Sequence, residues 1–200
     1  ADYTVEVRYK DHSATQAVRV LPDPRFAIAE AERRANWEAV ARAGGLQEEA
    51  TAAIERLRRT RADVDTVVRL AKAAQEEAKA KQKAAGAEGE PPHRDLLKAA
   101  KTLKEALTAM ERRLWVPPRS KGIQDDRTPW ARIGFALRTL QSSFAAPSPA
   151  QQAHLEAAAR ALAAVLPDVD RLYAGEVASF RAQARAAGLE LLAAEEGGTR

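Results

Sequence analysis

LQEEATAAIERLRRTRADVDTVVRLAKAAQEEAKAKQKAA, residues 46–85, is the stretch that decides the fold of this chain. Apolar residues recur in it every seven positions, and two more follow four positions after members of that series. The full set is Ala50, Ile54, Leu57, Val64, Val68, Ala71 and Ala78. This spacing places apolar side chains along one side of a helix, as in a coiled coil, although Arg61 and Gln75 weaken the pattern. We predict one long helix from about Leu46 to Ala85 that needs a partner.

The segment that follows predicts the partner helix. Gly86 to Pro92 breaks the pattern, and residues 93–115 then carry a second apolar stripe, made of Leu96, Ala100, Leu103, Leu107, Met110 and Leu114. We expect the two helices to fold back on each other as an antiparallel hairpin. Pro117-Pro118 ends the second helix, because proline cannot continue one.

Two matching start signals predict further helices. Thr128-Pro129 and Ser148-Pro149 each place a capping side chain before a proline that fits the first turn. The stripes that follow are Trp130, Ile133, Leu137, Leu140 and Phe144, and then Leu155, Ala159, Leu162, Leu166, Val169, Tyr173, Val177, Phe180 and Ala184 up to Gly188. Pro167 lies inside the second stripe and is predicted to kink or divide that helix near Leu166.

The N-terminal segment has a strand pattern instead. Tyr3, Val5, Val7 and Tyr9 alternate with polar residues, Asp11-His12-Ser13 is suited to a turn, and a second strand runs on to Pro22. A two-stranded hairpin is marginal in water. We therefore expect its apolar face to lie against the helices or to belong to a larger sheet.

The first helix is predicted to begin at Phe26 and to end at Gly44-Gly45, since glycine commonly terminates helices. Its Trp37 and Val40 are the apolar side chains nearest in sequence to the strands, so they are the expected cover for the hairpin. Trp37, Trp115, Trp130 and Tyr173 all lie on or beside apolar stripes, which predicts roles in the core.

These patterns together predict a mainly α fold. It is an antiparallel bundle of four to five helices with a long coiled-coil-like hairpin, preceded by a short N-terminal β-hairpin. The 46% hydrophobic and only 5% aromatic composition suits closely packed helices. We expect a β-hairpin over residues 1–24, the bundle over 25–190 and a frayed tail over 191–200. No apolar run approaches the roughly 18 residues of a membrane span.

The residue types offer little to catalysis. The chain has no cysteine, which excludes disulfides and thiolate metal sites, and His12, His93 and His154 lack partners at metal-site spacing. No phosphate-binding glycine loop or nucleophile elbow is present. The 32 basic residues are interleaved with 28 acidic ones, which does not favour nucleic acid as a partner. No enzyme activity, cofactor or metal is predicted.

One connection carries the candidate partner contacts. Basic residues gather at the end of the second long helix and beyond it, and two acids precede the next helix. The candidates are Arg112, Arg113, Arg119, Lys121, Asp125, Asp126 and Trp130. The cations could receive an anionic partner, while the acids favour a helix N-terminus.

Three groups of residues resemble a known family. They are Tyr3-Thr-Val-Glu-Val7 with Val18-Arg-Val-Leu-Pro-Asp-Pro-Arg25, then Trp130-Ala-Arg-Ile-Gly-Phe-Ala-Leu-Arg-Thr-Leu140, and then Pro147-Ser-Pro-Ala-Gln-Gln152 with Ala186-Ala-Gly-Leu189. The first resembles the C-terminal part of bacterial sortilin-like BNR-repeat proteins, often labelled glycosyl hydrolases, where an Ig-like sandwich ends before helices. The others resemble that family's last helical hairpin. Gly134 and Ala136 depart from the family, which tends to carry Asn and Lys there.

The resemblance implies a non-catalytic helical accessory module of a larger exported propeller protein, periplasmic or extracellular, which packs on its parent or on another protein. The family's Asp-box propeller turns are absent from these 200 residues, so any hydrolysis by the parent is expected outside this chain. Two alternatives remain open. One is a stand-alone coiled-coil assembly protein that associates through the seam from Ala50 to Ala78, and the other is a binder of acidic polymers.

Overall fold

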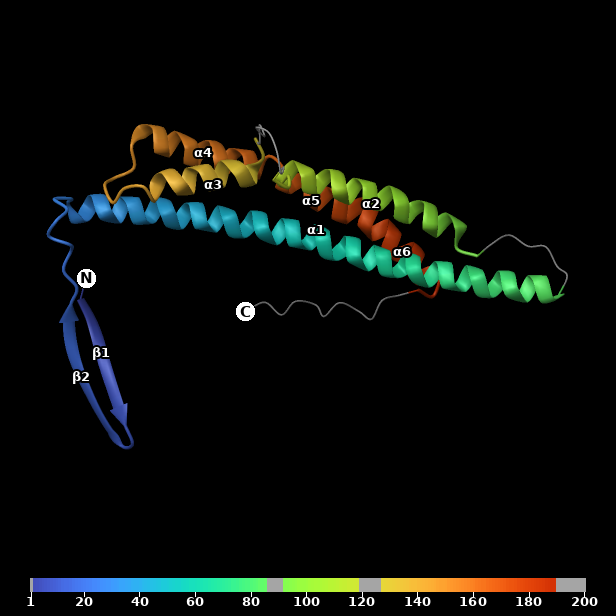
Figure 1. Cartoon of the computed structure of the whole chain (residues 1–200), viewed down its shortest axis with the longest axis horizontal. Coiled ribbons are helices and arrows are strands. Elements are labelled where there is room, and N and C mark those ends of the chain that lie inside the picture. Colours follow the sequence, from blue (N-terminus) through green and yellow to red (C-terminus); the bar gives the residue numbers. More distant parts are fainter. Residues whose placement is uncertain (1, 86–91, 119–126, 190–200) are drawn as a thin grey trace.

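The computed structural model describes residues 2–85, 92–118 and 127–189. Its axis is α1 (Glu30–Ala85), a helix of 56 residues that runs the length of the bundle (Figure 1). At 1.5 Å per residue α1 is about 84 Å long. The predicted seam of α1 is buried at Ala50, Leu57, Val64 and Ala71, so the prediction of a long helix that needs a partner is confirmed.

Helix α2 (Arg94–Leu114) folds back on α1 as predicted. Three contacts show the antiparallel register. The Gln75 side chain donates to the carbonyl of Pro92, just before α2, Lys104 donates to Asp65, and Arg58 donates to Glu111. The residue number on α1 falls as the number along α2 rises, as an antiparallel pair requires. Five of the six stripe residues of α2 are buried and Met110 is half-buried. Because Arg119 to Asp126 lie outside the described residues, the predicted polar connection is described only at Arg127.

Helix α3 (Pro129–Leu140) continues in the direction of α2 along the N-terminal half of α1. The predicted cap is present: the Thr128 hydroxyl accepts a hydrogen bond from the backbone N–H of Ala131 at 3.3 Å. At the far end, the buried Asn36 side chain of α1 donates to the carbonyl of Leu140 at 3.1 Å. The α2–α3 pair therefore covers α1 from one side over most of its length.

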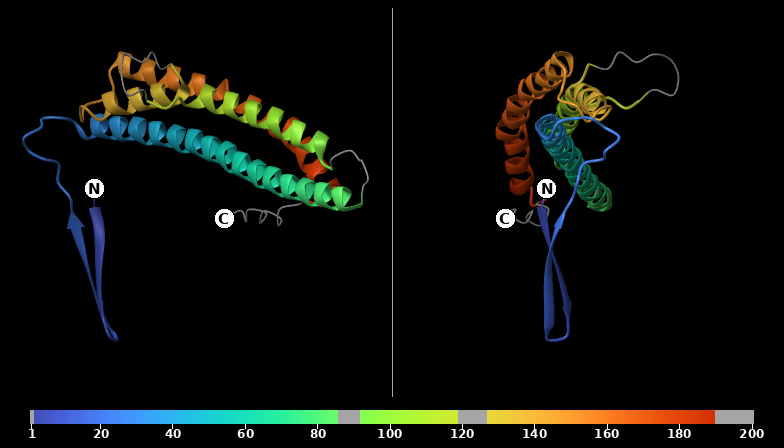
Figure 2. Two further views of the ribbon diagram at one scale, coloured as in Figure 1. Left: turned by 45° about the vertical axis from the view of Figure 1, so that its right-hand side comes forward. Right: turned by 90° about the vertical axis from the view of Figure 1, so that its left-hand side faces the viewer.

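A third helical arm returns parallel to α1. It consists of α4 (Pro149–Ala163), α5 (Leu166–Leu172), a π-helical turn η1 (Tyr173–Val177) and α6 (Ala178–Ala186). Figure 2 shows this arm beside both α1 and the α2–α3 pair: α4 packs against α3 and α1, and α6 packs against α2. Ser148 and Gln151 form a capping box at its start, and the predicted division at Pro167 falls between α4 and α5. Gly188 ends the arm with a positive φ of 68°.

The predicted helix end at Gly44-Gly45 is wrong, because α1 passes through both residues. A terminating glycine takes a positive φ, and Gly188 is the one glycine with that geometry among the described residues. Ala43 and Ala50 are fully buried on either side of the pair. Packing of α1 against α3 and α4 therefore outweighs the roughly 1 kcal/mol by which each interior glycine disfavours a helix.

The predicted cover of the hairpin is also wrong. Strands β1 (Asp2–Tyr9) and β2 (His12–Arg19) project from the end of the bundle in Figures 1 and 2, and every residue of both is exposed. Trp37, expected in the core, is 68% exposed. The proline-containing linker carries the strands away from α1 before they can pack on it.

Smaller differences concern the stripes. Val67 is buried where the stripe predicted Val68, and Ala158 is buried where it predicted Ala159. A small rotation of a helix about its axis is enough to exchange two such neighbouring residues. Phe144 lies beyond α3 and is exposed, whereas Tyr173 is buried as predicted and Trp115 and Trp130 are half-buried.

Helix continuity at the glycine pair is testable. An added Cβ at Gly44 or Gly45 meets nothing within 4 Å, so Gly44→Ala and Gly45→Ala should each raise the free energy of unfolding by about 0.5–1 kcal/mol. Gly188→Ala is the control, and its positive φ predicts a loss of about 1 kcal/mol. Chemical denaturation measures all three. Destabilisation by either α1 variant would show that the helix ends there.

Candidate interaction site

The hairpin has one apolar face. Tyr3 pairs with Val18, Val5 with Gln16, Val7 with Ala14 and Tyr9 with His12. Directly paired residues of an antiparallel sheet point to the same side, so both tyrosines and all three valines share one face. Its turn is the two-residue loop Lys10-Asp11, with Lys10 at a positive φ of 50°. This loop begins one residue before the predicted turn at residues 11–13 and shares Asp11 with it.

Both long edges of the hairpin are open. Within the described residues the sheet contains only β1 and β2, so each strand is paired on one side. The outward N–H and C=O groups of such strands can extend a sheet contributed by another chain. Two strands bury little area on their own. An apolar face and two open edges therefore lie together on one projecting element.

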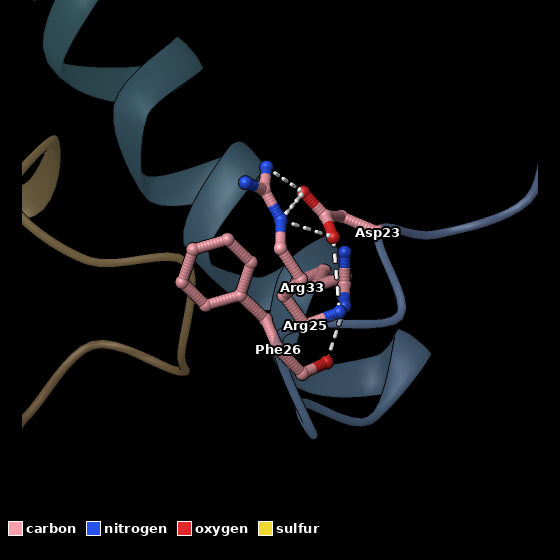
Figure 3. A network of polar contacts seen from close by, with 4 residues as sticks. All are labelled: Asp23, Arg25, Phe26 and Arg33. Carbon is pink, nitrogen blue, oxygen red and sulfur yellow. Dashed lines mark hydrogen bonds and ion pairs between the residues drawn. The ribbon is translucent and has the colours of Figure 1, made fainter.

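A short linker, residues 20–29, joins the hairpin to α1 and is folded on itself (Figure 3). Its Asp23 carboxylate accepts the backbone N–H of Arg25 at 2.9 Å and the Arg25 guanidinium at 2.7–3.1 Å. These hydrogen bonds lower the pKa of Asp23 below its ordinary value. At about pH 4, where an ordinary aspartate is half protonated, more than half of the Asp23 carboxylates are therefore still ionised.

Arg33 of α1 holds the other end of this linker. Its guanidinium donates to the carbonyls of Phe26 at 3.0 Å and Ile28 at 3.2 Å, and Figure 3 shows it beside the Asp23–Arg25 pair. The Phe26 ring lies edge-on to Phe144, with centroids 5.7 Å apart. The linker is thus attached both to α1 and to the α3–α4 connection, which fixes the direction in which the chain leaves the bundle.

The sequence-predicted contact residues are placed differently. Arg113 forms an ion pair with Asp168 of α5 at 2.6 Å, so it joins two parts of the bundle. Arg112 is exposed and lines a shallow groove of about 650 Å³ between α1 and α2. Trp130 packs half-buried on the core. Arg119, Lys121, Asp125 and Asp126 lie outside the described residues, so the structure does not test the predicted cluster as a unit.

The buried polar groups serve packing between helices. Glu111 of α2 accepts hydrogen bonds from Arg58 at 2.7 Å and Arg61 at 3.0 Å, both on α1. The Thr60 and Tyr173 hydroxyls are 2.8 Å apart, and the Arg56 guanidinium lies 3.6 Å from the centroid of the Tyr173 ring. Burial raises the pKa of Tyr173, which keeps the phenol neutral and able to donate. These groups connect helices.

Across the described ranges, no three His, Cys, Asp or Glu side chains come together as a metal site would require. Of the helices described, none combines the length and the apolar character that a membrane crossing demands.

Comparison of the chain with protein-family models, curated proteins and solved structures finds no match. None of these comparisons links the chain to sortilin-like BNR-repeat proteins, so that resemblance stays a prediction. The alternating sequence pattern predicted the hairpin. It did not predict that the hairpin is exposed, because that exposure depends on the path of the linker in the folded chain.

The linker contacts predict a fixed exit direction. Since the chain lacks cysteine, nitroxide labels at Leu21→Cys and Glu49→Cys report the distance between linker and α1 by pulsed electron paramagnetic resonance. We expect a narrow distance distribution in the unaltered protein. Arg33→Ala should broaden it, because this change removes both hydrogen bonds from Arg33 to the linker carbonyls of Phe26 and Ile28. Arg34→Ala is the matched control, because Arg34 contacts only the exposed Glu30 among the described residues. Equal distributions for all three proteins would contradict a role for Arg33.

Proposed function

We propose that this chain is a non-catalytic helical accessory module that docks onto a β-sheet of another protein domain through its N-terminal hairpin. The bundle serves as an elongated support, and the hairpin, the linker, Trp37 and Phe144 form its docking end. Binding proceeds by burial of apolar surface and by strand addition, with no bond made or broken.

One observation carries this proposal: the exposed apolar side chains concentrate at the docking end. Twelve large hydrophobic residues are widely exposed in the described parts of the chain, and ten of them lie there. Five are on the hairpin (Tyr3, Val5, Val7, Tyr9 and Val18), three on the linker (Val20, Leu21 and Phe26), and Trp37 and Phe144 complete the set. Clustered exposure of this kind marks interaction surfaces, whereas single exposed hydrophobics are ordinary.

The form of the hairpin indicates the kind of partner. A sheet edge offers N–H and C=O groups that complement an open strand, and alternate side chains supply the apolar contact. On the opposite face Glu6, Arg8, Asp2 and Arg19 are charged and paired along or across the strands. This charged face is suited to solvent. We therefore expect the partner to cover only the face that carries the tyrosines and valines.

The interior of the bundle favours this function over coiled-coil assembly. Ala50, Leu57, Val64 and Ala71 of the α1 seam are at most 2% exposed, because α2 and the C-terminal arm already cover them. A second chain could reach this seam only if the bundle opened. Self-association through the seam would therefore compete with the fold itself.

The identity of the partner domain is part of the proposal. On the resemblance of residues 3–7 and 18–25, the partner sheet belongs to the Ig-like domain of an exported BNR-repeat propeller protein, with the hairpin as its last two strands. The Asp-Pro-Arg sequence at residues 23–25 is then the junction between sheet and bundle, and the Asp23–Arg25 contacts give it a structural role.

Site-specific photocrosslinking in the producing cells tests the proposal. Benzoylphenylalanine placed at Val5 lies on the apolar face, and at Thr4 it lies on the opposite face of the same strand. We expect one discrete crosslinked product from Val5 and little or none from Thr4, because the apolar face is the covered one. Mass spectrometry then maps the second peptide, which should fall within a β-strand of another domain.

Three results would contradict it. Equal crosslinking from both positions would mean that contact is not specific to a face. Crosslinks from Val5 to the chain's own helices would mean that the hairpin folds back onto the bundle. The absence of any product from Val5 would mean that the apolar face stays uncovered.

A further inference from the structure

We propose that the outer face of the α3–α4 pair is a second docking surface, which binds a short acidic peptide segment. A groove of about 530 Å³ lies there, lined by Arg132, Phe135 and Arg138 of α3, by His154 and Ala157 of α4, and by Arg127 and Ala131. It is separate from the docking end, and the proposal does not depend on the function proposed for the hairpin.

The groove lies on the side of α3 that faces away from α1. Ile133, Ala136 and Leu140 are buried toward the core, whereas Arg132, Phe135 and Arg138 are exposed. Residues three apart on a helix are neighbours, so the two arginines flank the Phe135 ring by about one turn on each side. Phe135 meets the His154 ring edge-on at 4.7 Å between centroids. These rings form an apolar floor between two cations.

Local contacts place the two guanidinium groups. Arg132 donates through Nε to the carbonyl of Arg127 at 3.0 Å, which positions its side chain and leaves its terminal nitrogens without a hydrogen-bond partner among the described residues. Arg138 lies over Gly134, where Nη1 is 3.4 Å from the place of a missing Cβ. No described residue holds Arg138 in an ion pair.

The charge of this surface favours an acidic ligand. Helix α3 contains two arginines and no acid, and the single acid of α4, Glu156, is paired with Arg42 of α1 at 2.5 Å. Asp125 and Asp126 precede Arg127 in sequence and lie outside the described residues, so the argument rests on Arg132 and Arg138. Planar guanidinium groups bind carboxylates through paired hydrogen bonds.

The shape favours a short peptide over a polynucleotide. The two arginines are six residues apart, which is about 9 Å along the helix axis, and the small residues Ala131 and Ala157 complete the lining between them. A nucleic-acid surface needs a continuous basic stripe, but positive and negative residues are interleaved over most of this chain. Two carboxylates with an apolar side chain between them match the two cations and the Phe135 floor.

Fluorescence anisotropy on the full chain tests this inference. The probes are a short fluorescein-labelled peptide of Glu, Leu and Gly, its counterpart with Gln in place of Glu, and a short oligothymidylate of equal charge. We expect saturable binding of the acidic peptide and at least about tenfold weaker binding of the Gln peptide. The double variant Arg132→Gln with Arg138→Gln should lower the affinity for the acidic peptide by a similar factor.

The control is a second double variant that makes the same change in net charge outside the groove. Arg69→Gln with Arg181→Gln alters two exposed arginines that do not line the groove, and it should leave the affinity within about twofold, since distant surface charges are screened. Phe135→Ala should weaken binding without altering its salt dependence, because it removes apolar contact alone.

Four outcomes would overturn the inference. They are absence of binding by the acidic peptide, equal binding of the Gln peptide, equal loss in the control variant, and tighter binding of oligothymidylate through Arg132 and Arg138. The last would assign the groove to nucleic acid instead of a peptide. Circular dichroism of every variant separates lost binding from lost folding.

Discussion

The bundle depends on one constraint: α1 is far too long to bury its apolar side by itself. About 84 Å of helix must be covered by segments that are each much shorter. The C-terminal half of α1 is covered by α2 and by the arm from α5 to α6, and the N-terminal half by α3 and α4. Because the covering helices succeed one another along a single continuous axis, the molecule is elongated (Figure 1).

Polar contacts set the register of this alanine-rich packing. Alanine surfaces are smooth, so a helix could slide along another with little change in buried area. Glu111 between Arg58 and Arg61 fixes α2 against α1, and Tyr173 between Thr60 and Arg56 fixes the arm. Leaving one of these buried groups without its partner would cost more than an exposed ion pair contributes, which favours this register over shifted ones. The hairpin residues are all exposed instead, and in our proposal a partner sheet covers their apolar face.

The sequence predicted the features whose signals are local. The seam at Leu57 and Val64 shows in the apolar period, and the starts at Thr128 and Ser148 show in capping residues followed by proline. The prediction at Gly44-Gly45 was wrong, because a glycine pair indicates a helix end unless the burial of Ala43 and Ala50 is known. The exposure of Trp37 and the pairing of Arg113 with Asp168 depend on contacts between distant segments, which no periodicity reveals. For the same reason the groove between Arg132 and Arg138 was not foreseen.

Small-angle X-ray scattering of the full chain tests the central claim, that one unbroken α1 sets the length of the molecule. The continuous helix predicts a maximum dimension of about 84 Å or more, at a concentration low enough to give the mass of a single chain. A compact domain of 200 residues would instead have a radius of gyration of about 16 Å, and a rod as long as α1 would have about 24 Å. A value near the compact figure would show that α1 folds back on itself, most simply at Gly44-Gly45, and would contradict this account.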